Sequence, residues 1–375
     1  MEAYLDNAAT TRVFDNAVDA AANAMRIGFF NPNATYRASV DANAEMERAR
    51  NALAAAVGAK SDEIYFTSCA TEANNWAIER GRKRIKGNVV ITAGEHASVY
   101  EPAMQLKSRG IDVRVVPLTR GGQVDGDALL AAVDKETALV SVIHVSNETG
   151  AVNNIKKLAA AVKAKSPTTV FHSDGVQAVL KTREPISSLG VDLYSASAHK
   201  IGAPKGIGFL YVRRGFGIAP LLYGGGQEKN LRSGTQNTPY IAAFAAAAED
   251  FARSADINKI AAIRDRLSEH FIKNGCEIVG SGPNSGFVLC VHVPAVKAEI
   301  LQNIASDNGV IVGKGSACSG SKRGNRVLGA MGLSEKAAEC CIRLSFFVNT
   351  ELDAALDAAR IITECADRIR SGHVK

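Results

Sequence analysis

Two short polar segments at the ends of apolar runs carry the residues best suited to chemistry. Lys200 follows the apolar run 191–194, and Asp174 closes the run 169–174. A buried lysine or carboxylate is costly unless it has a partner or a chemical task. A lysine amine can attack a carbonyl carbon, and a carboxylate stabilises a neighbouring cation. The alternatives are a lysine that extends to water and an aspartate that only caps the next helix.

Three further apolar runs end in polar residues of complementary types. His96 supplies an aromatic ring, Asn147 supplies an amide, and Thr71 stands where the run 63–67 leads directly into a helix. A helix N-terminus with a hydroxyl side chain can bind an anion. Because ligands of open α/β sheets bind beyond the carboxyl ends of the strands, we expect these residues on one rim. Lysine, carboxylate, ring partner and anion cradle together predict a pyridoxal phosphate site.

One of the seven cysteines differs from the others in its surroundings. Cys318 lies in a glycine- and serine-rich segment between Lys314 and Lys322, and neighbouring cations lower the pKa of a thiol. The alternative is an inert loop cysteine. Cys340 and Cys341 are expected on a helix, where adjacent residues point to different faces. Neither a disulfide framework nor a metal site fits the spacing of the set, which is Cys69, Cys276, Cys290, Cys318, Cys340, Cys341 and Cys365.

The elements that must position these residues follow a regular alternation of apolar runs and helical stretches. The predicted strands are 63–67, 88–92, 112–117, 138–144, 169–174, 192–196 and 208–213. Helices are predicted between them, as at 126–133 and 154–165. This alternation predicts an α/β fold with a mostly parallel sheet and helices on both faces. One strand–helix–strand unit separates Asp174 from Lys200, which places the two residues near each other.

A second pattern begins with a long connecting helix, 240–254. The elements predicted after it are strands near 277–279, 286–292 and 342–347, and helices at 298–308 and 351–370. A chain of 375 residues exceeds the size at which a single core stops growing. We therefore expect a large domain, 15–250, and a smaller α+β domain made of 1–14 and 251–375, which carries the cysteine loop.

Composition argues against several classes of function. The chain is 46% hydrophobic and 22% charged, and its sequence contains no apolar run long enough to span a membrane. The formal charge of +6 is spread over short basic clusters without the interleaved aromatic residues of nucleic-acid-binding surfaces. We expect a cytoplasmic protein without a leader peptide that binds neither membranes nor nucleic acid directly.

The order of these motifs resembles the NifS-like cysteine desulfurases, a family of the class V aminotransferase superfamily. The matching segments are 4–11, 70–72, 95–96, 147–148, 174–177, 197–200, 232–235, 315–318 and 342–345. They cover nearly the whole chain, and their combined order and spacing are highly specific. The resemblance implies the pyridoxal-phosphate-dependent aminotransferase fold (fold type I) and a desulfurase that converts L-cysteine to L-alanine.

The resemblance also implies a role for each matching residue around the cofactor. Lys200 would hold pyridoxal 5'-phosphate as a Schiff base, and Asp174 would keep its pyridine nitrogen protonated. Gln177 would bond the phenolic oxygen, and His96 would stack on the ring and take part in catalysis. Asn147 would contact both the cofactor and the substrate.

Further matching residues would bind the phosphate, the substrate and the sulfur. The phosphate-binding set would be Ala70, Thr71, Ser197, His199 and, from the second subunit of a homodimer, Thr235. Asn7 and Arg343 would bind the substrate, Arg343 through the carboxylate, a bidentate task that suits a guanidinium. Cys318 would take up the sulfur as a persulfide and pass it to an acceptor protein, in iron–sulfur cluster assembly or tRNA thiolation.

The residues leave three functions open: a desulfurase, a selenocysteine lyase or transaminase of the same superfamily, and a non-catalytic relative. Cys318 argues against a transaminase, and the intact lysine and carboxylate argue against a non-catalytic protein. The sequence departs from the family at Cys69, which replaces a glycine, at Gln227, which replaces a histidine, and in the segment 322–328. The chain ends soon after 361–370, without the extended tail that binds iron–sulfur scaffold proteins in some relatives, which weakens the expectation of delivery to such a scaffold.

Overall fold

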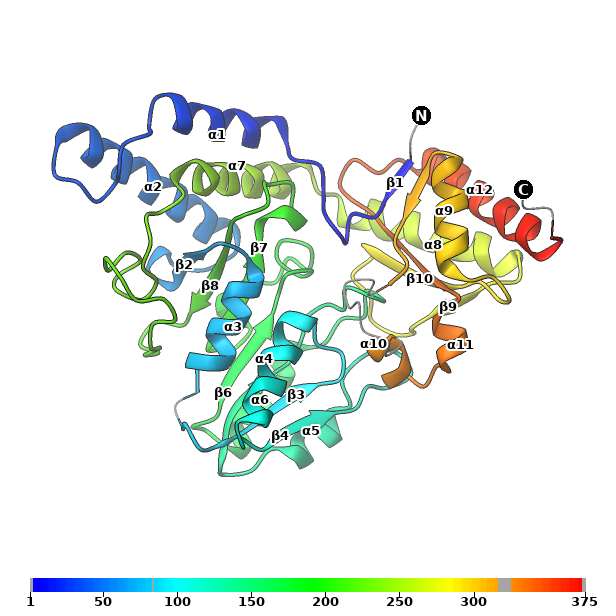
Figure 1. The fold of residues 1–375 in the computed structure, drawn as a ribbon, viewed down its shortest axis with the longest axis horizontal. Coiled ribbons are helices and arrows are strands. Elements are labelled where there is room, and N and C mark those ends of the chain that lie inside the picture. Colours follow the sequence, from blue (N-terminus) through cyan, green and yellow to red (C-terminus); the bar gives the residue numbers. More distant parts are fainter. Residues whose placement is uncertain (1–2, 83, 316–324, 373–375) are drawn as a thin grey trace.

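The computed structural model describes residues 3–82, 84–315 and 325–372, and its largest element is a seven-stranded sheet (Figure 1). The strand order is β2-β8-β7-β6-β5-β3-β4. The strands are β2 (Ile64–Thr67), β3 (Asn88–Thr92), β4 (Val113–Val116), β5 (Thr137–Ser141), β6 (Val170–Asp174), β7 (Leu193–Ser197) and β8 (Gly208–Val212). Strands β7, β6, β5, β3 and β4 run parallel, and β8 runs antiparallel to both β7 and β2. The predicted mostly parallel sheet is confirmed.

Helices cover both faces of this sheet. One face carries α3 (Ala70–Arg80) and α4 (Ala97–Ser108). The other face carries α2 (Arg37–Ala56), α5 (Gly126–Ala132), α6 (Ile155–Lys165) and α7 (Thr238–Ser254), and α1 (Asp15–Arg26) packs on α7. The predicted arrangement of helices on two faces is therefore confirmed.

The strands are buried because the helices enclose them from two sides. Every residue of β2, β3, β5, β6, β7 and β8 is buried, the pattern of a sheet covered on both faces. Successive side chains of β3 enter different cores. Val90 belongs to the cluster of Phe171 in β6, whereas Val89 and Ile91 belong to that of Trp76 in α3. Packing on both faces of the sheet therefore fixes the positions of the residues at its edge.

Two smaller sheets lie beside the large one (Figure 1). The three-stranded antiparallel sheet has the order β12-β10-β9, and a short parallel sheet pairs β1 with β11. Their strands are β1 (Ala3–Leu5), β9 (Glu277–Val279), β10 (Val288–His292), β11 (Val310–Val312) and β12 (Cys341–Ser345). The helices of this part are α8 (Ile257–Lys273), α9 (Ala298–Asp307), α10 (Arg326–Ala330), α11 (Glu335–Ala338) and α12 (Leu352–Arg370).

One expectation for this part is wrong. Cys341 is the first residue of β12 and pairs with His292, whereas a helix was expected at Cys340 and Cys341. The preceding helix α11 already ends at Ala338, because the chain must extend to pair with β10. Both are free cysteines in the structure, Cys341 buried and Cys340 half-buried.

The two parts of the chain share a hydrophobic core. Phe251 in α7 contacts both Phe287 and Phe347, with ring centroids 6.3 and 5.7 Å away, and Phe347 contacts Phe14 at 5.5 Å. The division of the chain into a large domain, 15–250, and a smaller domain, 1–14 with 251–375, stays a proposal. No helix within the described ranges is long and apolar enough to cross a membrane.

Candidate active site

Lys200 and Gln177 converge on one backbone carbonyl. Lys200 lies in a single 3-10 turn, Ala198–Lys200, so it is one turn beyond β7 rather than at the strand end. Its Nζ donates hydrogen bonds to Ala8 O at 2.7 Å and to Ala9 O at 2.6 Å. Gln177, which follows β6, donates from Nε2 to the same Ala8 O at 2.9 Å. The N-terminal segment therefore joins two of the predicted site residues.

Asp174 and His96 are linked through two residues. Asp174 is 3% exposed, and its Oδ2 accepts a hydrogen bond of 2.9 Å from Asn74 Nδ2. The same amide donates to Ser98 Oγ at 2.8 Å, and Ser98 Oγ lies 2.8 Å from His96 Nδ1. The other carboxylate oxygen of Asp174, Oδ1, accepts a hydrogen bond from Val176 N and so caps the following turn. Asn74 and Ser98 connect these two predicted site residues, and sequence reasoning missed them because nothing local marks their partners.

The start of α3 offers the anion site predicted at Ala70 and Thr71. The N-cap residue, Cys69, makes no side-chain capping bond, so the first amides of the helix remain available to a ligand. Cys69 has an extended backbone with φ −175°, which confirms that this turn does not require glycine. Gly208 provides room beside the helix start, since a Cβ there would lie 2.6 Å from Ala196 O and 3.1 Å from Ala70 N.

Ser197 and His199 lie on the same rim as Lys200. Ser197 is buried at the end of β7, and His199 Nδ1 lies 3.2 Å from Thr10 Oγ1. Burial, and then the charge of Lys200, lowers the pKa of His199 to about 3. His199 is therefore neutral near pH 7 and can donate one hydrogen bond to an anion.

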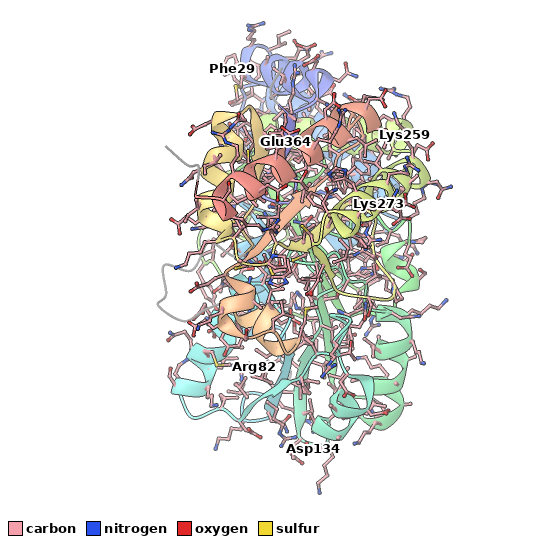
Figure 2. The ribbon with its side chains drawn as sticks, turned by 90° about the vertical axis from the view of Figure 1, so that its right-hand side faces the viewer. Phe29, Arg82, Asp134, Lys259, Lys273 and Glu364 are labelled. Carbon is pink, nitrogen blue, oxygen red and sulfur yellow. The ribbon has the colours of Figure 1, made fainter. Side chains whose placement is uncertain are left out.

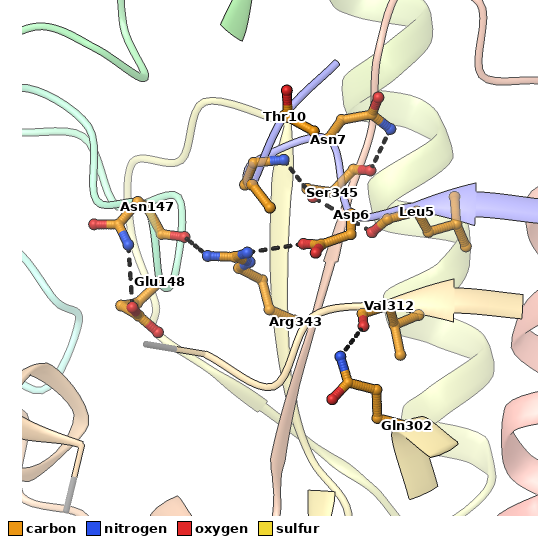
Figure 3. Close-up of polar contacts among 12 residues, drawn as sticks. Leu5, Asp6, Asn7, Thr10, Asn147, Glu148, Gln302, Val312, Arg343 and Ser345 are labelled. Carbon is orange, nitrogen blue, oxygen red and sulfur yellow. Dashed lines mark hydrogen bonds and ion pairs between the residues drawn. The ribbon is translucent and has the colours of Figure 1, made fainter. Parts of the chain in front are cut away.

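Arg343 joins β12 to two other parts of the site (Figure 3). Its Nη1 donates to Asn147 O at 2.9 Å, and its Nη2 pairs with Asp6 Oδ1 at 2.8 Å. Asn7 is held nearby, since its Nδ2 donates to Ser345 O at 2.9 Å. The structure thus brings Arg343, Asn147 and Asn7 together, and it adds Asp6, which sequence reasoning missed.

Thr235 lies in a different setting. It lines a pocket of about 160 Å³ together with Thr67 and Ser68, which precede α3 in the same chain. Its neighbour Gln236 accepts a hydrogen bond of 2.8 Å from Asn33, in the connection between α1 and α2. Nothing in these contacts tests a role for Thr235 in the site of a second subunit.

The predicted nucleophile Cys318 lies outside the described residues, as does Lys322. Lys314, on the near side of that segment, pairs with Glu299 Oε2 at 3.4 Å. On the far side, Asn325 Nδ2 donates to Glu148 Oε2 at 3.3 Å. The surroundings of the thiol therefore remain a prediction from the sequence.

Two buried ionisable groups also escaped the sequence reasoning. Burial raises the pKa of the Glu95 carboxyl to about 7, one residue before His96. Lys181 donates to Gln177 Oε1 at 3.1 Å, and burial, followed by the charge of Lys200, lowers the pKa of Lys181 to about 7. Of these two residues, only Glu95 was marked in the sequence, by its position in the matching segment 95–96.

The residues present fit pyridoxal phosphate. The buried carboxylate of Asp174 suits a protonated ring nitrogen, the amine of Lys200 suits a carbonyl carbon, and the start of α3 suits a phosphate. These groups come from three elements whose ends meet at one rim, as ligand sites of open α/β sheets do.

The fold and this site define a class of protein: the chain belongs to the aminotransferase class-V family, whose model matches residues 3–355. Within that family the chain is one of the NifS-like cysteine desulfurases. Cysteine desulfurase IscS of Dictyoglomus turgidum is 36% identical, over 97% of this chain and 95% of the relative. A solved NifS-like protein has a TM-score of 0.90 and 33% identity, covering 98% of this chain and all (100%) of that chain. A structure described as SspA in complex with cysteine has a TM-score of 0.79 and 30% identity, over 92% of this chain and 99% of its own.

Proposed function

We propose that this protein is a pyridoxal-phosphate-dependent cysteine desulfurase that converts L-cysteine to L-alanine and passes the sulfur on through Cys318. The observation that carries the proposal is the arrangement at the rim of β6 and β7. Lys200 and Gln177 meet at one carbonyl there, and Asp174 is hydrogen-bonded through two residues to His96. The names of the family relatives support the same activity.

The residues at the rim would hold the cofactor. When bound, pyridoxal phosphate withdraws electrons from an attached amino acid, so that bonds at its α- and β-carbons can break. Lys200 would hold its carbonyl carbon, Asp174 its ring nitrogen, and Gln177 its phenolic oxygen. The phosphate-binding set would be Ala70, Thr71, Ser197, His199 and Thr235.

His96 would move protons at a defined nitrogen. The backbone N–H of Ser98 donates to His96 Nδ1 at 3.1 Å, so a neutral His96 ring carries its proton on Nε2. This tautomer presents Nε2–H, which can give a proton to the reacting amino acid.

Arg343 and the two asparagines would bind the substrate. A guanidinium recognises a carboxylate through paired hydrogen bonds, and Arg343 lies beside both Asn147 and the N-terminal segment that carries Asn7. The substrate would therefore be an α-amino acid whose carboxylate points toward β12.

Sulfur transfer needs a second nucleophile. The Cys318 thiolate would attack the sulfur of the bound L-cysteine, forming an S–S bond while the carbon–sulfur bond breaks. The electron pair of the broken bond stays with the β-carbon, which takes up a proton and becomes the methyl group of L-alanine. The products are L-alanine and a persulfide on Cys318, whose outer sulfur would then be transferred to a nucleophile of a sulfur acceptor protein.

We also propose that the protein acts in the cytoplasm as a homodimer. Exposed aromatic side chains support a subunit contact, among them Phe29 at 67% and Tyr223 at 75% exposure. Phe29 and Asn33 both lie in the connection between α1 and α2, and Asn33 bonds Gln236, next to Thr235. A partner seated there would bring Thr235 close to a second site.

The decisive experiment replaces Cys318 with serine. We expect Cys318→Ser to remain yellow with bound cofactor and to bind L-cysteine, yet to lose nearly all production of sulfide and L-alanine. Cys340→Ser is the matched control and should keep its activity, while Lys200→Ala should lose the covalently bound cofactor. If Cys318→Ser kept most of its turnover, a lyase that needs no protein thiol would be the better assignment.

A further inference from the structure

We propose that Asp6 is a positioning residue that orients Arg343 for the carboxylate of the substrate. The inference rests on the proposed function, in which Arg343 binds that carboxylate. It assigns a role to the N-terminal segment, which lies far from Arg343 in the sequence but beside it in the structure (Figure 3). Asp6 would not contact the substrate itself.

Arg343 is too deeply buried to be oriented by water. Its side chain is 8% exposed, and its Nε is buried without a hydrogen-bond partner in the described part of the chain. Among the described residues, two hydrogen bonds fix the guanidinium, namely Nη2 with Asp6 Oδ1 at 2.8 Å and Nη1 with Asn147 O at 2.9 Å. Because a guanidinium is planar and carries five N–H groups, two contacts on different nitrogens set its plane and leave other donors for a ligand.

Asp6 can hold Arg343 because its own backbone is anchored. Asp6 forms a bridge with Ser345, and the next residues bind the same serine through Asn7 Nδ2 to Ser345 O at 2.9 Å and Ala8 N to Ser345 Oγ at 2.7 Å. Tyr4 Oη donates to Asp6 O at 3.1 Å and closes the turn. The carboxylate is therefore fixed to the same strand, β12, that carries Arg343.

Gly313 provides the space for this pair. It forms two backbone hydrogen bonds with Arg343, at 2.8 and 2.9 Å. A Cβ at Gly313 would lie 2.7 Å from Asp6 Oδ1, 3.0 Å from Arg343 Nη2 and 3.1 Å from Nε. A side chain at this position would push the carboxylate and the guanidinium apart, so Gly313 offers an independent way to disturb the same contact.

The test compares ligands with and without a carboxylate. The holoprotein is titrated with L-alanine and with ethylamine, which is alanine without its carboxylate, and binding is followed by the absorbance of the cofactor. We expect Asp6→Ala and Gly313→Ala to weaken L-alanine binding roughly tenfold to a hundredfold, the scale of a misplaced binding group. Asp6→Asn should have an intermediate effect, and ethylamine binding should not change. Asp15→Asn is the control, because Asp15 belongs to an exposed pair with Arg12.

A double-mutant cycle separates the inference from the proposed function. If Asp6 acts through Arg343, then adding Asp6→Ala to Arg343→Ala should weaken L-alanine binding no further. In turnover assays, Asp6→Ala should raise KM for L-cysteine more than it lowers kcat. Should Arg343→Ala leave L-alanine binding unchanged, the substrate assignment of the proposed function fails. Should Arg343→Ala weaken it while Asp6→Ala does not, or should Asp6→Ala tighten it or weaken both ligands equally, the role of Asp6 is overturned.

Discussion

Glu95 places an ionisable carboxyl in the interior, one residue before His96. Its Oε1 accepts hydrogen bonds of 2.8 Å from both Thr92 Oγ1 and Ile143 N, while its Oε2 has no partner among the described residues. Burial raises the Glu95 pKa from 4.5 to about 7, and the nearby charge of Asp174 acts in the same direction. The unfolded chain releases the Glu95 proton above about pH 4.5, whereas the folded protein keeps this proton up to about pH 7.

The sign of the resulting pH dependence follows directly. Between pH 4.5 and about 7 the folded state holds more protons than the unfolded state, so Glu95 makes stability fall as the pH rises. Glu95→Gln stays neutral and keeps an oxygen for both donors. We expect the free energy of unfolding of the variant to equal that of the natural protein at about pH 5 and to exceed it by roughly 1–3 kcal/mol at about pH 8. Urea unfolding at the two pH values measures this, with the exposed Glu136→Gln as control. An equal gain at both pH values would contradict it.

At the scale of elements, the rim of β6 and β7 depends on a close contact. Gly175 follows Asp174 directly, and a Cβ on it would lie 1.9 Å from two ring carbons of Tyr194 in β7. Tyr194 cannot move freely, because it is buried and its Oη lies 2.9 Å from His144 Nδ1. The absence of a side chain at residue 175 therefore lets the two strands meet beside the cofactor site.

A methyl group at this position should separate the two strand ends. We expect Gly175→Ala to lower the free energy of unfolding by about 1–3 kcal/mol, the usual cost of overpacking. The loss should be much smaller in a Tyr194→Leu background, which removes the ring carbons. Gly217→Ala is the matched control, since a Cβ there meets nothing within 4 Å. Equal losses in the two backgrounds, measured by urea unfolding, would show that the tyrosine is not the cause.

The sequence predicted the elements of the large sheet because most of its strands are apolar runs, and β2, β3, β5, β6 and β7 each end in a polar residue. It also predicted Asp174, Lys200 and Arg343 as chemical groups. It missed β1 and β11, since three residues are too few to show a periodic pattern. It missed Asn74 and Asp6 because their partners lie 100 and 337 residues away, and no local pattern encodes such pairs.

At the scale of the whole molecule, three aromatic side chains cluster in the connection between α1 and α2. Figure 2 shows Phe29 at the opposite end of the molecule from Asp134. Phe29 stacks on Phe30 with ring centroids 4.3 Å apart, and Phe30 contacts Tyr36 at 6.2 Å. Clustered exposed aromatic residues are typical of interaction surfaces. This surface supports the proposed homodimer.

A charge within this cluster should weaken the dimer. We expect Phe29→Asp, combined with Tyr36→Asp, to raise the dimer dissociation constant at least about a hundredfold, because both aromatic side chains would lose their partner surface. Cofactor retention should fall in parallel if Thr235 serves the neighbouring site. Ile85→Asp is the control, since Ile85 is 77% exposed in the segment that follows α3. Sedimentation velocity over a range of concentrations measures the assembly, and a stable active monomer of the natural protein would rule the dimer out.

The pairing of β1 with β11 and of Asp6 with Arg343 has a consequence for biosynthesis. All strands of the large sheet lie between residues 64 and 212, so that sheet can form while the ribosome is still translating. The N-terminal strand leaves the ribosome first, but its partners follow about 300 residues later, a wait on the order of tens of seconds at ordinary translation rates. The contact between Asp6 and Arg343 is therefore completed late in synthesis. A chain that ends before β12 lacks the Asp6–Arg343 contact, so the proposed carboxylate-binding site can form only when synthesis is nearly complete.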